Sequence, residues 1–173
     1  MVNIFNGELI MNKTNVMRIL DQHKLSYNHY EYDSNITNGV EVATALNQNM
    51  AQVFKTLVTT GSDNNHYVFV VPVAKTLDLK KGAKAVNVKS VEMLKQKDLF
   101  PLTGYIHGGC SPIGMKKSFK TVVDITATQF STIIFSAGKV GYQVELKPQD
   151  LQNLINCHFD DIVQPHKAVA LRV

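Results

Sequence analysis

Two β-rich segments with a turn between them constrain the fold of this chain most strongly. Residues 53–60 (VFKTLVTT) and 66–73 (HYVFVVPV) are rich in β-branched and aromatic side chains. Between them stands GSDNN, residues 61–65, a cluster of residues that favour turns. The pattern predicts a β-hairpin. Because the second segment is apolar almost throughout, we expect both faces of the hairpin to be covered.

The rest of the chain holds clusters of helices between runs of short strands. The periodicity of apolar residues predicts helices at 14–24, 39–47, 77–87, 90–98 and 148–156. Further strands are predicted at 27–32, 105–106, 121–125, 132–136, 142–146 and 159–163. This order is no regular strand–helix–strand repeat, so it predicts a mixed α/β (α+β) single domain. We expect an N-terminal extension at 1–12, the domain at 13–164 and a C-terminal tail at 165–173.

Length and composition are typical of a soluble globular protein. A chain of 173 residues buries roughly 70% of its unfolded surface on folding, so it needs no disulfide or metal for stability. The longest apolar run, residues 67–74, is far shorter than the roughly 20 residues of a membrane-spanning helix. The N-terminus lacks the features of a secretory signal. We expect a cytoplasmic protein with no membrane partner.

Cysteine and histidine do not form a metal-binding pattern. Cys110 and Cys157 lie far apart in the sequence, and we favour two free thiols over a disulfide. The histidines, at positions 23, 29, 66, 107, 158 and 166, lack the spacing of metal ligands. We therefore expect neither a metal nor a cofactor.

Positive charge is concentrated in one part of the chain. The formal net charge is +4, but residues 75–120 hold ten lysines against three acidic residues. Such a concentrated positive field suits a polyanionic partner, for example a nucleic acid. A lysine-rich helix face exposed to solvent explains the same pattern, and charge alone does not decide between the two.

Two glycine-rich loops and one lysine are the candidates for chemistry. Gly108–Gly114 holds three glycines and a proline, and Ser136–Gly141 directly follows a predicted strand. Small residues allow the backbone to approach a ligand and direct N–H groups at it, although each loop also suits a tight β-turn. Lys55 interrupts an apolar strand, so it lies either at a strand edge or in a cleft.

Four motifs occur in an order that resembles one known family. They are Phe54-Lys55-Thr56-Leu57, then Thr103-Gly104-Tyr105 leading into Gly108–Gly114, then Ser136–Gly141, and finally Pro148-Gln149-Asp150-Leu151. Together they resemble the YbaK/EbsC-type Cys-tRNA(Pro)/Cys-tRNA(Cys) deacylases, which are related to the editing insertion domain of bacterial prolyl-tRNA synthetases. The resemblance extends from residue 14 to residue 163.

The resemblance implies a curved, largely antiparallel mixed sheet or partial barrel surrounded by helices. It also implies an enzyme that works in trans and removes cysteine wrongly attached to tRNA(Pro). A synthetase pocket for proline excludes cysteine poorly, because small side chains of similar volume differ by only about 1–3 kcal/mol in binding. The implied partners are tRNA and, left open, prolyl-tRNA synthetase. Cys-tRNA(Cys) is left open as a second substrate.

Roles for individual residues follow from the same resemblance. Lys55, Ser136 and Gly138 are the expected catalytic residues, with Lys55 holding the terminal phosphate or adenosine. The expected substrate-binding residues are Tyr32, Thr56, Gly108, Gly109 and Ser111. The expected tRNA-binding residues are Lys80, Lys81, Lys84, Lys116, Lys117 and Lys120.

The residues do not assemble a Ser-His-Asp or Cys-His nucleophile, although Ser111 beside Cys110 is a candidate for one. The resemblance favours substrate-assisted cleavage. In this mechanism the thiol of the attached cysteine attacks the carbonyl of its own ester, and the products are a cyclic thiolactone and free tRNA. A thiol has a reference pKa of about 8.5 and needs little activation at neutral pH.

The chain departs from the family pattern at two positions. Ala137 stands where a glycine is common, and Gln143 lies where an acidic residue is frequent. These departures keep open a tRNA- or synthetase-binding module without turnover. Two further alternatives are a deacylase for another small aminoacyl-tRNA such as Ala-tRNA(Pro) and a related hydrolase that acts on a different small ester.

Overall fold

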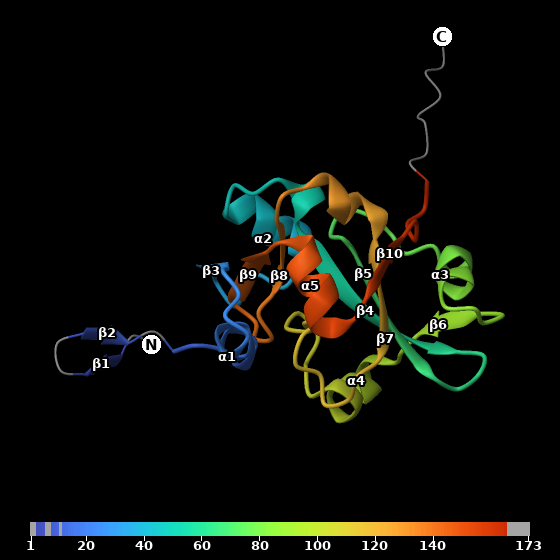
Figure 1. Ribbon diagram of the computed structural model, residues 1–173, viewed down its shortest axis with the longest axis horizontal. Coiled ribbons are helices and arrows are strands. Elements are labelled where there is room, and N and C mark those ends of the chain that lie inside the picture. Colours follow the sequence, from blue (N-terminus) through green and yellow to red (C-terminus); the bar gives the residue numbers. More distant parts are fainter. Residues whose placement is uncertain (1–2, 6–7, 11, 166–173) are drawn as a thin grey trace, which may run out of the picture.

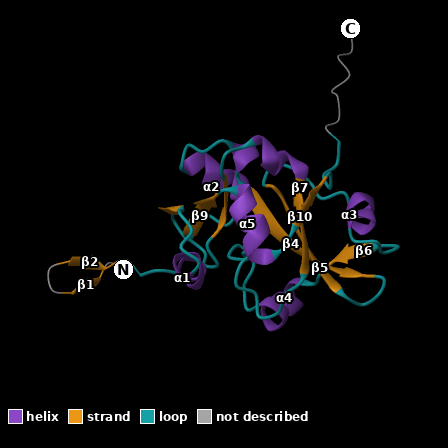
Figure 2. Ribbon diagram, viewed as in Figure 1, coloured by secondary structure: helices purple, strands orange, loops and turns teal. Residues whose placement is uncertain are grey.

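The predicted hairpin lies at the centre of the fold (Figures 1 and 2). The structure is a computed structural model that describes residues 3–5, 8–10 and 12–165. β4 (Phe54–Gly61) pairs antiparallel with β5 (His66–Pro72), and the Gly61 N–H donates to the Asn65 carbonyl across the turn. Phe54 and Val58 pack into one apolar cluster, and Leu57 packs against another. Both faces of the hairpin are therefore covered, as predicted.

The hairpin belongs to a five-stranded mixed sheet. β5 pairs in parallel with β7 (Lys120–Asp124), and β7 pairs in parallel with β10 (His158–Asp160). On the other side, β6 (Val91–Met93) pairs antiparallel with the end of β4 only, at residues 59–61. The strand order is β10-β7-β5-β4-β6. In the described part of the chain, residues 54–57 therefore pair with β5 along one edge and with no strand along the other.

A second, antiparallel sheet lies beside this open edge. It consists of β3 (Asn28–Glu31), β9 (Tyr142–Leu146) and β8 (Ile133–Ser136), in the order β3-β9-β8. A single bridge between Val53 and Ile134 joins β8 to the chain just before β4. Two open sheets surrounded by helices confirm the expected mixed α/β fold.

Five helices within residues 12–165 cover the sheets. They are α1 (Asn15–Gln22), α2 (Gly39–Ala45), α3 (Leu79–Ala85), α4 (Gln96–Thr103) and α5 (Pro148–Ile155), with short 3-10 turns at η1 (Met50–Gln52) and η2 (Ile125–Gln129). Side-chain oxygens of Thr14, Asn38 and Asp78 accept N–H groups at the starts of α1, α2 and α3. None of the helices within residues 12–165 is long and apolar enough to cross a membrane.

Two predictions between residues 90 and 106 are wrong. The predicted helix at 90–98 begins only at Gln96, because residues 91–93 pair with the end of β4, a long-range contact that local periodicity does not contain. The predicted strand at 105–106 does not form. Instead α4 continues past Pro101, which lacks one N–H near the helix end, and closes at Gly104 with φ +82°.

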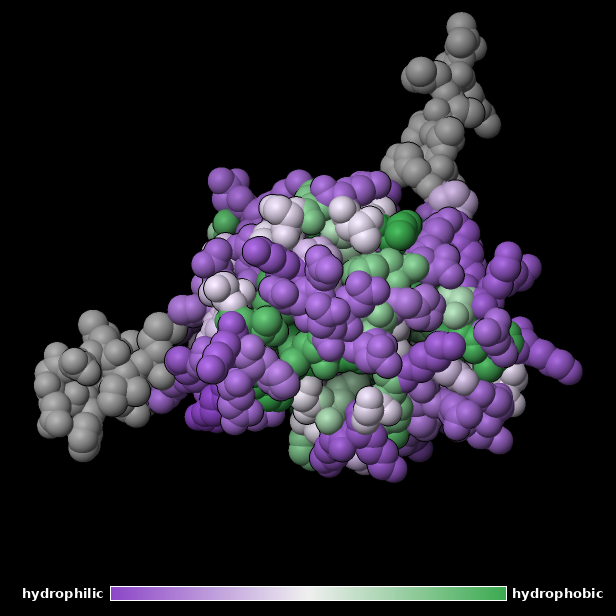
Figure 3. Space-filling view, in the orientation of Figure 1, coloured by the Kyte–Doolittle hydropathy of each residue, from purple (hydrophilic) through white to green (hydrophobic). Residues whose placement is uncertain are grey.

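The chain ends lie partly outside the described residues. Within the predicted extension, β1 (Asn3–Phe5) and β2 (Glu8–Ile10) form a hairpin whose strands pair only with each other in the described part of the chain. Residues 166–173 of the predicted tail lie outside it. The face of the molecule in Figure 3 carries mainly hydrophilic side chains, with apolar ones exposed between them.

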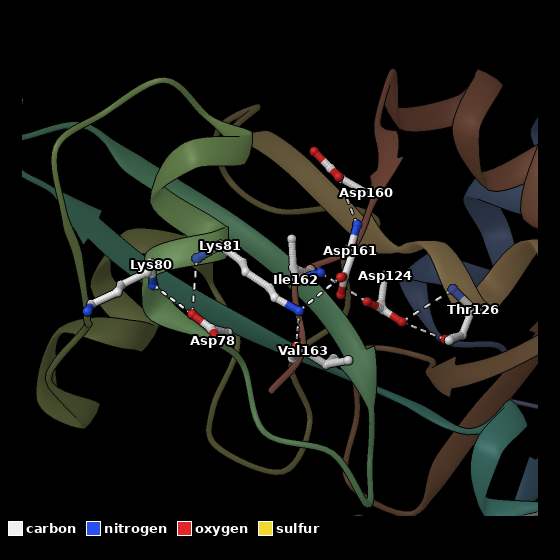
Figure 4. Close-up of polar contacts among 9 residues, drawn as sticks. All are labelled: Asp78, Lys80, Lys81, Asp124, Thr126, Asp160, Asp161, Ile162 and Val163. Carbon is white, nitrogen blue, oxygen red and sulfur yellow. Dashed lines mark hydrogen bonds and ion pairs between the residues drawn. The ribbon is translucent and has the colours of Figure 1, made fainter. Parts of the chain in front are cut away.

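The buried carboxylate of Asp124 anchors the segment that follows β10 (Figure 4). It accepts hydrogen bonds from the Ile162 N–H at 3.1 Å, the Thr126 N–H at 3.2 Å and the Thr126 hydroxyl at 2.6 Å. Nearby, the Lys81 ammonium donates to the exposed Asp161 carboxylate at 2.9 Å and to the Val163 carbonyl at 3.0 Å. This segment therefore ties the end of the domain to β7 and α3.

Replacing Asp124 by alanine leaves these three donors without their acceptor, so we expect the free energy of unfolding to fall by about 2–4 kcal/mol. Urea denaturation of wild type and variant measures the loss. Asp161→Ala is the matched control, because an exposed ion pair contributes less than about 1 kcal/mol. Equal losses in the two variants would contradict the anchoring role of Asp124.

Candidate active site

A cavity of about 280 Å³ opens at the unpaired edge of β4. Its walls come from the first half of β4, the start of α2, the ends of β8 and β9, and the loop at residues 107–110. The cavity exists because β6 covers only the far end of β4 and leaves residues 54–57 open towards the second sheet. The sheet topology therefore places the cavity where the sequence has its unusual lysine.

Lys55 supplies the fixed positive charge of this cavity. Its side chain is about half-buried, and burial lowers the pKa of its ammonium. The described residues that line the cavity include no aspartate or glutamate, and neither ion pair within residues 12–165 involves Lys55. A partly desolvated cation without a carboxylate partner favours an anionic ligand.

The neighbouring Thr56 adds polar groups at the same edge. Val73 N–H donates to Val53 C=O, and Gly61 N–H donates to Asn65 C=O, so odd-numbered residues of β4 direct their main-chain groups at β5. By the alternation of an antiparallel ladder, the main-chain groups of Thr56 point towards the open edge. Its hydroxyl oxygen is buried and has no hydrogen-bond partner in the described part of the chain. Thr56 thus offers a ligand both main-chain and side-chain groups.

The end of β8 contributes a hydroxyl held by the following turn. The Gly138 N–H donates to Ser136 Oγ at 3.1 Å, which leaves the Ser136 hydroxyl proton free to donate to a ligand. Gly138 has φ +86°, and a Cβ there would lie 2.9 Å from Tyr105 Cε1. Ala137, in contrast, has no positive φ, and its methyl group is buried in the core. The departure from glycine at Ala137 therefore does not disturb this turn.

Gln143 of β9 forms the polar back of the cavity. It is only 5% exposed, and its Oε1 accepts a hydrogen bond from Gln48 Nε2 at 2.9 Å. The amide pair holds a neutral group at the position where the family pattern often has an acidic residue. The cavity therefore keeps its positive charge.

Comparison with known proteins places this arrangement in a family. The family model of the aminoacyl-tRNA editing domain matches residues 33–154. The chain belongs to this family. It is 49% identical over 152 residues to EbsC of Enterococcus faecalis, a match that covers 87% of this chain and 93% of that protein; EbsC carries the name of a Cys-tRNA(Pro)/Cys-tRNA(Cys) deacylase.

More distant matches extend the likeness. The uncharacterized protein YwhH of Bacillus subtilis is 22% identical over 121 residues, which cover 70% of this chain and 76% of that protein. A solved structure described as a trans-editing enzyme for prolyl-tRNA synthetase superposes with a TM-score of 0.76 at 22% identity, over 87% of this chain and 95% of that one. At this identity the match shows a shared fold.

Within this editing domain, the cavity gathers most of the catalytic and substrate-binding residues expected from the sequence. Lys55, Thr56, Tyr32, Gly108 and Ser136 line it. Two of the expected glycines, Gly109 and Gly138, lie behind the lining, where they allow close packing: a Cβ at Gly109 would lie 3.0 Å from the main-chain nitrogen of Val140.

Ser111 is not brought to the cavity. Its side chain is fully buried, and its Oγ accepts a hydrogen bond from the Ile113 N–H at 3.3 Å. The adjacent Cys110 lines the cavity instead, and burial raises the pKa of its thiol to about 12. At neutral pH the thiol is protonated, so neither Ser111 nor Cys110 has the properties of an activated nucleophile.

The expected tRNA-binding lysines lie in two separate places. Lys80, Lys81 and Lys84 belong to α3, which Figure 1 shows far from α2, and the start of α2 lines the cavity. Lys116, Lys117 and Lys120 precede or begin β7, and Lys116 contacts Phe100 of α4. The six lysines therefore do not form one continuous patch, and the ammonium of Lys81 already binds Asp161.

Several lining residues were not expected from the sequence. On β9, Gln143 and Val144 point to opposite faces of the strand, and the pattern predicts that the face with Gln143 is exposed to solvent. In the structure Gln143 is buried and hydrogen-bonded to Gln48. His107 and Asn38 also line the cavity, and Asn38 is held by its role as the cap of α2. Of these, only the capping role of Asn38 has a local sequence signal, an asparagine directly before a predicted helix.

The partly buried thiol of Cys110 gives a direct test of this geometry. In a Cys157→Ala variant, we expect iodoacetamide to alkylate Cys110 about 100-fold or more slowly than it alkylates glutathione at pH 7, because the raised pKa leaves little thiolate. Mass spectrometry of timed samples measures the rate, and unfolding in urea serves as the control that restores it. Alkylation of the folded protein at the rate of a free thiol would contradict a protonated, partly buried Cys110.

Proposed function

We propose that this chain is a trans-acting aminoacyl-tRNA deacylase that removes cysteine from mischarged Cys-tRNA(Pro), and that Cys-tRNA(Cys) is a second substrate. The observation that carries the proposal is the half-buried Lys55, a cation without a carboxylate partner among the described lining residues. The 49% identity to EbsC supports the choice of cysteine. We also propose tRNA and prolyl-tRNA synthetase as cytoplasmic partners, in line with the related trans-editing structure.

Lys55 binds the phosphate of the terminal nucleotide and so fixes the ribose ester in the cavity. The Ser136 hydroxyl and the edge groups of Thr56 then lie near the ester, where donors stabilise the negative charge that develops on the carbonyl oxygen. Tyr32 and Gly108 complete the walls around the aminoacyl group. In this arrangement the protein orients the ester and supplies no nucleophile of its own.

The nucleophile is the thiol of the substrate. Its sulfur gives up a proton and attacks the ester carbonyl, so that a C–S bond forms while the bond between the carbonyl carbon and the ribose oxygen breaks. The ribose oxygen takes up a proton, and the products are a cysteine thiolactone and free tRNA. Because the reacting atoms belong to one molecule, orientation supplies much of the rate enhancement.

Substitution of Lys55 tests the assignment. We expect Lys55→Ala to lower kcat/KM for Cys-tRNA(Pro) at least about 100-fold, and Lys55→Arg to retain part of the activity, since a cation remains. Release of radiolabelled cysteine from preformed Cys-tRNA(Pro) measures both. Lys89→Ala, a lysine exposed between α3 and β6, is the matched control. Full activity in Lys55→Ala would refute the role of this cation.

Substrate choice tests the mechanism. If the substrate thiol is the nucleophile, Ser-tRNA(Pro) and Ala-tRNA(Pro) are cleaved at least about 100-fold more slowly than Cys-tRNA(Pro), because they lack the reacting sulfur. The same release assay with the three charged tRNAs measures the ratio. Efficient cleavage of Ala-tRNA(Pro) would instead identify the chain as a deacylase for alanine.

The lowered pKa of Lys55 predicts a pH dependence of binding. The protonated ammonium binds phosphate, so affinity is constant near neutral pH and falls as the pH rises through a value below the ordinary 10.5 of lysine. Titration calorimetry with a non-hydrolysable 3′-amide analogue of cysteinyl-tRNA measures this between pH 7 and pH 10. Lys55→Arg stays charged, so its affinity should change less over that range; identical profiles would exclude Lys55 as the titrating group.

A further inference from the structure

Two exposed apolar side chains stand beside the cavity. Phe100 and Ile106 are 56% and 57% exposed, the highest values among the large apolar residues within residues 12–165. Each is the chain neighbour of a residue that lines the cavity: Leu99 precedes Phe100, and His107 follows Ile106. The end of α4 and the loop that follows it, which carry Phe100 and Ile106, therefore contribute to the cavity wall through Leu99 and His107.

The local structure holds Phe100 outward. Leu99 and Leu102 of α4 pack against the core and Thr103 is buried, so Phe100 lies on the outer side of the helix. The helix ends at Gly104, whose N–H donates to the Phe100 carbonyl. The next residue, Tyr105, is buried and its hydroxyl donates to the Ile113 carbonyl, which fixes the loop behind the ring.

Lys116 lies across the same helix end. The ideal Cβ position of Gly104 is 3.3 Å from Lys116 Cγ and 3.4 Å from its Cε, so the stem of the lysine passes close over the glycine. Its Nζ reaches 5.0 Å from the centroid of the Phe100 ring, within cation–π range. Ring and ammonium thus form one unit, which we call the Phe100–Lys116 platform.

The charge around the platform is positive. Lys95, Lys97 and Lys117 are also exposed in this part of the chain, and Asp98 is the acidic residue of α4. None of these lysines takes part in the ion pairs found in the described ranges, which involve Lys13 and Lys81. Exposed aromatic rings with unpaired cations beside them are the means by which proteins bind single-stranded nucleic acid, through base stacking and phosphate contacts.

We propose that the Phe100–Lys116 platform binds the unpaired nucleotides that precede the terminal adenosine of tRNA. The proposal rests on the proposed function, which places the aminoacyl ester at Lys55. The nucleotides just before that ester must then cross the rim of the cavity. They are single-stranded, so a base is free to stack on Phe100 while Lys116 binds an adjacent phosphate. A double-helical stem would offer phosphates but no free base face to the ring.

Binding of a short RNA tests the platform without any chemistry. The probe is an uncharged single-stranded oligonucleotide that ends in CCA, followed by fluorescence anisotropy. We expect Phe100→Ala to weaken binding about 5- to 100-fold, the range for the loss of one base–aromatic stack, and Phe100→Trp to restore it. Met93→Ala is the matched control. Met93 is 48% exposed on β6, so this substitution removes an exposed apolar side chain that lies outside the platform.

Turnover provides the second measurement. For Phe100→Ala we expect the ratio of kcat/KM on Cys-tRNA(Pro) to kcat/KM on cysteinyl-adenosine to fall by the same factor, since the short ester lacks the stacked nucleotides. Lys116→Ala should reduce the slope of affinity against salt concentration.

Three results overturn the proposal. They are wild-type protein that does not bind the oligonucleotide, Phe100→Ala that binds it as tightly as wild type, and equal losses on the long and short esters, which would indicate a structural role for the ring. Absence of any deacylation by wild type would refute the proposed function instead, and the binding experiment would still decide on the platform.

Discussion

The site depends on the incomplete pairing of one strand. β5 accompanies β4 over its whole length, whereas β6 covers only residues 59–61. A strand edge left open inside a domain exposes backbone groups that need partners, and here the second sheet approaches without closing the gap. Lys55 and Thr56 lie on the open half. The unpaired half of the β4 edge therefore borders the cavity, and it contributes a cation and polar main-chain groups to the cavity wall.

Sequence patterns were informative wherever the deciding interaction is local. The hairpin, the helix caps and the opening of α5 at Pro148 all follow from residues a few positions apart, and the family motifs pointed to Lys55 and Ser136. Long-range contacts account for the failures. Residues 91–93, predicted to be helical, form β6 because they pair with β4. Ser111 lies outside the cavity because its side chain is buried and accepts a hydrogen bond from the Ile113 N–H. Gln143 drew attention only as a departure from the family pattern, and its place in the cavity lining depends on Gln48, which lies 95 positions away.

The position of the positively charged surface could be predicted from the sequence even less well than the fold. A run of lysines between residues 75 and 120 looks like one patch in the sequence, yet the fold divides it between α3 and the neighbourhood of α4. In the second group, Lys116 contacts Phe100, and the preceding residue, Leu99, lines the cavity. A positive stretch of chain thus indicates a polyanionic partner, but the position of the binding surface depends on which lysines the topology brings beside the reactive group.

The hydrogen bonds of Asp124 also affect how the protein folds during its synthesis. β10 is among the last described elements, yet it pairs in parallel with β7, and Ile162 bonds to both Asp124 and Asp78. A growing chain therefore holds a sheet with an unfinished edge at β7 until residues 158–163 have been synthesised. During that interval β7 has an unpaired edge of the kind on which other chains pair, and the pairing of β10 with β7 removes it.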